Sequence, residues 1–226
     1  MKLELVAALS QMYSEPHRKY HNLAHIHYCL RQAKEAFSHA VPLGVQHAIW
    51  FHDALYDPYA AAETNERNSV GLYMNYFREH RTQPWYHEAI ACIEATMFYA
   101  NARELDHLAD GAVSAIGREK DYYCHTEISL FPKGNYEGIR RAMDYFLDID
   151  FSILGDNPYV YKWYSTNVRN EYYITSDAEY FVGRVAFLKG LLKNPIYRTD
   201  KFKAREEQAR RNIESEIYDL THYGEL

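Results

Sequence analysis

VQHAIWFHDALY, at residues 45–56, is a strongly apolar segment that carries the charged dipeptide His52-Asp53. Ile49 and Trp50, together with the spacing of the apolar residues, predict a largely buried helix. A His-Asp pair in such a helix is costly to bury unless another group compensates it. A divalent cation would do so, because imidazole and carboxylate are both good ligands for first-row metals. A hydrogen-bonded His-Asp pair at a helix end is the alternative.

A second segment, YHNLAHIH at 20–27, places His21 and His25 four residues apart. In a helix this spacing puts both side chains on one face. The chain has 12 histidines, so ordinary surface or capping histidines would also account for the spacing. Adjacent helical residues diverge by about 100°, so His52 and Asp53 can reach one ion only beside the end of their helix.

The third segment, FLDIDFSILGDNP at 146–158, sets Asp148 and Asp150 into an apolar run. A carboxylate in such surroundings needs a metal, an arginine or a helix cap. A cap formed by Asp150 or Ser152 is therefore an alternative to a metal site.

Helical periodicity extends over most of the chain, and no strand-rich block, internal repeat or low-complexity linker interrupts it. The region from 101 to 135 is rich in glycine and poor in periodic apolar residues, which predicts a short helix followed by a long inserted loop. We therefore expect one all-α domain over 1–226. The predicted helices begin near Leu3 and continue at about 23–39, 45–56, 64–80, 84–99, 136–155, 158–173, 177–193 and 199–219.

Composition limits the classes of partner. A formal net charge of −6 argues against a nucleic-acid backbone, because no excess positive field attracts phosphates. A small phosphorylated substrate stays compatible, since a bound divalent cation reverses the local charge. The charged segment at 205–216, REEQARRNIESE, predicts a solvated helix face, with a homodimer contact as the alternative.

The cysteines and the apolar runs favour a cytoplasmic protein. Cys29, Cys92 and Cys124 are far apart and form no CxxC pair, as expected for reduced thiols. No apolar run approaches the length that a bilayer requires. The short apolar start is interrupted by Glu4 and does not read as a signal peptide.

The order His, then His-Asp, then a distant Asp resembles the HD superfamily of metal-dependent phosphohydrolases. More closely, the chain resembles a bacterial group of predicted HD phosphohydrolases, from about Ser14 to the end. This resemblance implies an all-α HD-domain helical bundle, here with extra C-terminal helices. The motifs that carry it are EPHRKYHNLAHI (15–26), WFHDALYDP (50–58), NERNS (65–69), FLDIDFSILG (146–155) and VRNEY (168–172).

The resemblance implies a metal site made by four residues: His25, His52, Asp53 and Asp150. A similar YHNxxHA segment in cyclic-nucleotide phosphodiesterases favours His25 as the ligand and His21 as the proton donor. The Asp-Phe-Ser setting favours Asp150 over Asp148 in the same way. HD sites take a divalent transition metal, here Mn²⁺, Fe²⁺, Co²⁺ or Ni²⁺, with Mg²⁺ or Zn²⁺ as alternatives.

One departure from related sequences concerns the number of metals. Those sequences place one or two histidines after IxAT, whereas this chain reads IEATMFYAN at 93–101. We therefore expect one metal per chain. His107 or His125 from the inserted region could supply a second site, but we expect them to be solvent-exposed loop residues.

Further residues receive expected roles from their positions in these motifs. Asp53 is expected to orient the attacking water as well as to bind metal. Glu66 is expected to bond to one of the metal ligands or to bind a water molecule at the site. The alternative for Glu66 is a favourable charge in the first turn of a helix. The cations expected to bind substrate are Arg18, Lys19 and Arg169; an ion pair between Arg169 and Glu171 is the alternative.

The leading functional expectation is hydrolysis of a phosphomonoester or phosphodiester, in a nucleotide or related small metabolite. Two alternatives stay open. One is a non-catalytic, metal-stabilised helical module that binds a nucleotide or a protein. The other is a di-iron HD oxygenase, against which the missing histidines weigh.

Overall fold

The computed structural model describes residues 3–38, 40–99, 101–117 and 136–222. These residues form eleven α-helices and three 3₁₀ helices, and no strand occurs among them. The all-α prediction is therefore confirmed for the part of the chain that is described. None of these helices combines the length and the apolar character that crossing a membrane requires.

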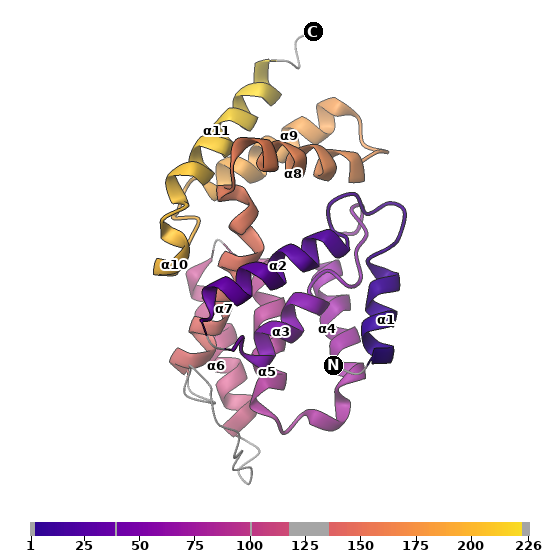
Figure 1. The fold of residues 1–226 in the computed structure, drawn as a ribbon, viewed down its shortest axis with the longest axis vertical. Coiled ribbons are helices and arrows are strands. Elements are labelled where there is room, and N and C mark those ends of the chain that lie inside the picture. Colours follow the sequence, from indigo (N-terminus) through magenta and orange to yellow (C-terminus); the bar gives the residue numbers. More distant parts are fainter. Residues whose placement is uncertain (1–2, 39, 100, 118–135, 223–226) are drawn as a thin grey trace.

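The first seven α-helices form a bundle in the lower part of Figure 1, with three short 3₁₀ helices at helix ends. The α-helices are α1 (Leu3–Met12), α2 (Leu23–Ala36), α3 (Leu43–Phe51), α4 (Thr64–Tyr76), α5 (Pro84–Ala95), α6 (Ala102–Gly117) and α7 (Tyr136–Asp150). The 3₁₀ helices are η1 (Arg78–His80), η2 (Thr96–Phe98) and η3 (Phe151–Gly155).

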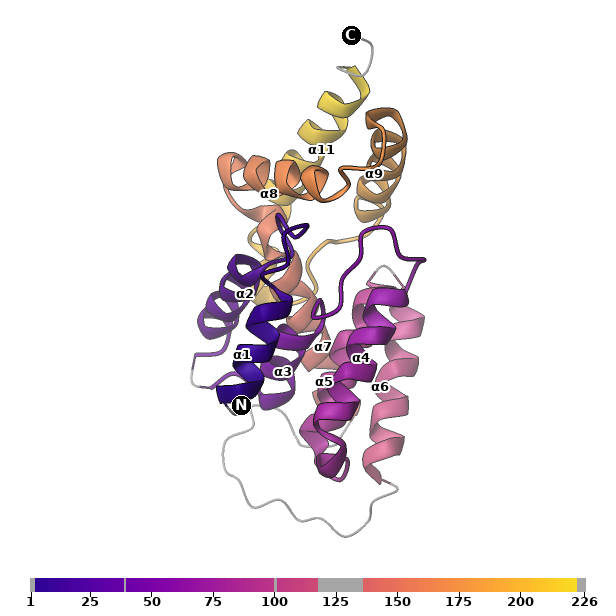
Figure 2. The same ribbon diagram turned by 90° about the vertical axis from the view of Figure 1, so that its right-hand side faces the viewer.

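The C-terminal helices lie at one end of this bundle, and α7 leads up to them (Figures 1 and 2). They are α8 (Pro158–Glu171), α9 (Asp177–Leu191), α10 (Asp200–Lys203) and α11 (Glu206–His222). Both α8 and α11 pack against η3, and α11 also packs against α9.

Helix α3 lies at the centre of the bundle, where it packs against α2, α4, α5 and α7. Its apolar side chains Val45, Ala48, Ile49 and Phe51 are fully buried. The apolar character of this segment thus fixes it in the core, and its C-terminal end carries His52 into the interior.

The end of α3 differs from the prediction. The helix stops at Phe51, and His52 forms its C-cap by donating its backbone N–H to Ala48 O at 2.9 Å. Ala54 then donates to Phe51 O at 3.1 Å, which closes a tight turn. His52 and Asp53 therefore lie where the chain leaves the helix, which is where two adjacent residues can reach one point.

Two other elements were predicted inaccurately. Residues 102–117 form a full sixteen-residue helix, α6, because Leu105, Ala109 and Ala112 are buried where α6 packs against α5 and α7. The rest of the predicted loop, 118–135, lies outside the described residues. The last predicted helix is two helices, α10 and α11, separated near Ala204.

Candidate metal centre

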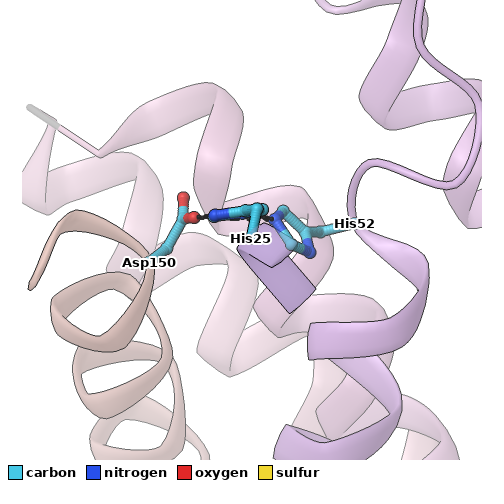
Figure 3. A group of neighbouring side chains, drawn as sticks. All are labelled: His25, His52 and Asp150. Atoms are coloured by element: carbon cyan, nitrogen blue, oxygen red, sulfur yellow. Dashed lines mark hydrogen bonds and ion pairs between the residues drawn. The ribbon is translucent and has the colours of Figure 1, made fainter. Parts of the chain in front are cut away.

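Side chains from three separate elements converge at one point (Figure 3). His25 lies on α2, His52 caps α3 and Asp150 is the last residue of α7. His25 Nε2 lies 3.1 Å from His52 Nε2 and 3.2 Å from Asp150 Oδ1. One ligand atom from each residue lies within 4.8 Å of the other two, as the coordination of a single metal ion requires.

Asp53 joins this cluster from the turn after α3. Its Oδ2 lies 3.0 Å from His52 Nε2 and 3.7 Å from His25 Nε2. The four residues expected as ligands are thus brought together, although they come from positions up to 125 residues apart in the chain (150 − 25).

The two histidines of the cluster are buried, the two carboxylates are partly buried, and the charges are concentrated. His25 and His52 are each 2% exposed. Burial lowers the pKa of His52, but the carboxylates of Asp53 and Asp150 outweigh it and raise that pKa well above the usual value. Burial raises the pKa of Asp53 and of Asp150, yet the two imidazoles bring both pKa values down. Both carboxylates are therefore ionised, and a cation would balance them.

The second ring nitrogen of His52 is held by the main chain. Its Nδ1 donates to Ile49 O at 3.0 Å. Once Nε2 loses its proton, as metal binding requires, the lone pair of Nε2 is therefore directed at the cluster. A ligating histidine is commonly oriented by such a bond to its other nitrogen. On His25 the corresponding Nδ1 lies 3.7 Å from the buried Cys29 thiol. Burial raises the pKa of that thiol, which therefore stays protonated.

His21, the expected proton donor, is held by Glu171. The His21 Nδ1–H donates to Glu171 Oε2 at 2.6 Å, and Tyr56 Oη donates to the same oxygen at 3.0 Å. Burial lowers the pKa of His21, but the charge of Glu171 outweighs it and the net pKa is raised. The Glu171 carboxylate thus favours the protonated form of His21, whose Nε2 makes no hydrogen bond within the described part of the chain.

The sequence suggested that Arg18 binds substrate. In the structure its side chain is not free to do so. Its guanidinium is buried and donates to Asp53 O at 2.6 Å, Ala54 O at 2.9 Å and His21 O at 3.2 Å. These bonds join the loop before α2 to the turn after α3. Arg18 therefore positions the segments that carry His21 and Asp53, and its donors are used for that purpose.

The other two expected substrate cations also have local partners. Lys19 Nζ donates to the Pro16 carbonyl at 2.7 Å on the surface. Arg169 donates to Asp177 and to the Thr175 carbonyl, and so holds the turn between α8 and α9. The alternative ion pair between Arg169 and Glu171 is not formed, because Glu171 faces His21 instead.

Glu66 lies in the first turn of α4, half-buried. Burial raises the pKa of Glu66, and the nearby Asp53 carboxylate raises it further, which places the two carboxylates within electrostatic range. His107 is exposed on α6, where its nearest charged partner is Glu104 at 3.8 Å. His125 lies outside the described residues.

Asp148 and Asp150 have separate roles. The Asp148 carboxylate accepts the backbone N–H of Arg198 and of Thr199, and also the Thr199 hydroxyl at 2.6 Å. It therefore holds the segment before α10. Asp150, two residues later, faces the two histidines.

A cavity of about 470 Å³ adjoins the cluster between η3, α8 and α9, and both His21 and Asp150 line it. Its size falls within the usual range for small-molecule sites. A group bound there would therefore lie next to His21 and next to Asp150, one of the four clustered side chains.

Comparison of the chain with protein-family models, with curated proteins and with solved structures finds no match. The resemblance to the HD superfamily thus depends on the motifs of the chain itself.

Proposed function

We propose that this chain is a metal-dependent hydrolase of the HD type that cleaves a phosphomonoester or phosphodiester of a small metabolite. The observation that carries this proposal is the convergence of His25, His52, Asp53 and Asp150 beside a cavity. A cytoplasmic setting is part of the proposal and is supported by the buried Cys29 and Cys92, which form no disulfide among the described residues.

The donor set fits a divalent transition metal. Two imidazole nitrogens and two carboxylate oxygens suit Mn²⁺, Fe²⁺, Co²⁺ or Ni²⁺ better than Mg²⁺, which prefers oxygen ligands throughout. When bound, such an ion lowers the pKa of a coordinated water molecule and polarises a phosphoryl oxygen.

His21 supplies the proton that the leaving group needs. Water adds its oxygen to phosphorus, the bond from phosphorus to the ester oxygen breaks, and that oxygen takes the proton from His21 Nε2. One proton of the water returns to the imidazole, so the products are an alcohol and a phosphate. Glu171 keeps the proton of Nδ1 in place throughout, because its carboxylate stays bonded to that nitrogen.

The pair formed by His21 and Glu171 favours catalysis over a purely structural metal. A metal that only stabilised the helices would need no protonated imidazole at the wall of the adjoining cavity. A module that only binds a nucleotide or a protein would not need the pair of His21 and Glu171 either.

The test is a panel of phosphomonoesters, cyclic nucleotides and dinucleotides with Mn²⁺, Co²⁺ or Ni²⁺. We expect turnover of at least one class, lost in Asp53→Ala and reduced about 100-fold or more in His21→Ala, the usual range for a general acid. Metal binding without turnover of any class would contradict a hydrolase and favour the binding module.

A further inference from the structure

The cavity beside the cluster has an aromatic wall. Tyrosine and phenylalanine side chains from the loop before α2, from η3 and from the region of α8 and α9 contribute to it. Among the described residues that line it are Tyr20, Phe151, Tyr164, Tyr172, Tyr180 and Phe187. Such rings offer faces and edges on which a flat aromatic group can stack.

The cavity offers no free positive charge from the described residues. Two basic side chains line it: His21, which is paired with Glu171, and Arg184, which is buried. Its guanidinium donates to both carboxylate oxygens of Glu216, at 2.8 and 3.2 Å, and to Tyr164 Oη at 3.2 Å. The ion pair therefore neutralises Arg184.

The remaining charges at the cavity wall are negative. Glu179 lines it and is held at the start of α9 by a capping box with Ser176. Asp150 lies at the end next to the histidines. An additional phosphate in this cavity would face carboxylates with no unpaired cation to compensate it, which is unfavourable.

We propose that this cavity binds the leaving group of the ester, and that this group is an uncharged alcohol with a flat aromatic ring, carrying a single phosphoryl group. A nucleoside and a simple aryl alcohol share this chemistry. The inference rests on the proposed function, because it assigns the substrate class of the same site. It predicts preference for monophosphate esters over di- and triphosphates.

A pair of glycines on α9 gives a matched test. A Cβ added at Gly183, which lines the cavity, would meet no atom within 4 Å, and the same holds at Gly190, which lines a separate cavity. Gly183→Leu therefore places a side chain in the proposed site, and its Cβ does not clash with any neighbouring atom. Gly190→Leu makes the same change on the same helix away from it.

Binding of adenosine, thymidine, phenol and ribose is measured by calorimetry on the metal-loaded protein and both variants. We expect an aromatic probe to bind and ribose not to bind, with affinity lost about tenfold or more in Gly183→Leu and kept in Gly190→Leu. Tighter binding of a nucleoside than of phenol would identify the leaving group as a nucleoside, and the reverse would identify it as a simple aryl alcohol. Equal affinity in Gly183→Leu and the unaltered protein, or binding of no aromatic probe, would overturn the inference.

Turnover distinguishes this inference from the proposed function. Gly183→Leu should raise KM for aromatic monophosphate esters but leave methyl phosphate hydrolysis unchanged, because a methyl group does not reach the cavity. Aromatic binding without any turnover would refute the hydrolase and keep the aromatic site. Turnover of aromatic esters that Gly183→Leu does not alter would keep the hydrolase and refute the site.

Discussion

Glu171 serves both the fold and the site with a single buried carboxylate. Its Oε1 accepts the backbone N–H groups of three successive residues, 19–21, each at 2.8 Å. Its Oε2 accepts from His21 and Tyr56. Burial raises the pKa of Glu171, but the His21 charge and these bonds outweigh it and lower that pKa to about 2. The carboxylate is therefore ionised over the whole pH range in which His21 could donate a proton.

Replacing Glu171 by glutamine should shift the pH dependence of kcat. Protonated His21 is the donor, so activity falls as pH rises through the His21 pKa. Glu171→Gln removes the charge that raises this pKa, and the alkaline limb should move to lower pH. Tyr56→Phe, which removes a bond to the same oxygen but no charge, is the control. An identical alkaline limb in Glu171→Gln and the unaltered enzyme would contradict the role of Glu171.

Arg18 should matter for stability rather than for substrate affinity. Arg18→Met leaves the Asp53 and Ala54 carbonyls without their donors and should lower the free energy of unfolding by about 3 kcal/mol. The neighbouring Lys19→Met, on an exposed side chain, should change it by less than about 0.5 kcal/mol. Urea unfolding curves measure both. Equal midpoints for the two variants would refute this assignment.

At the scale of elements, helix positions followed from the sequence better than helix ends did. The apolar spacing in 45–56 predicted α3, but the helix stops at Phe51. The helix ends there because the Ala54 N–H bonds to the Phe51 carbonyl and closes a turn. Arg18, from another segment, also donates to the Asp53 and Ala54 carbonyls. Periodicity carries no information on such contacts.

The contact of η3 with the C-terminal segment depends on Gly155. A Cβ there would lie 2.7 Å from Arg205 Cβ and 2.9 Å from its carbonyl oxygen, so the backbones would have to separate. Gly155→Ala should lower the free energy of unfolding by about 1–3 kcal/mol. Gly71→Ala, on α4 with no atom within 4 Å, should raise it by about 0.5–1 kcal/mol. Thermal melts test this, and equal effects of the two substitutions would contradict the close approach.

At the scale of the whole molecule, the sequence predicted the ligand cluster but not its surroundings. His52, Asp53, Asp148 and Asp150 stood out because polar residues in apolar segments need compensation. The choice of His25, and of Asp150 over Asp148, came from the resemblance to HD proteins. The bond between Glu171 and His21 joins residues 150 positions apart, and no local pattern indicates it. The cavity likewise forms only when α8 and α9 meet η3.

The metal content of the protein after loading with Mn²⁺ and removal of free ions tests the central claim most directly. We expect about one ion per chain in the unaltered protein, and none in His52→Ala or Asp150→Ala. His107→Ala, which removes an exposed histidine on α6, should retain the full amount. Full occupancy in His52→Ala and Asp150→Ala, or no bound metal in the unaltered protein, would contradict the account.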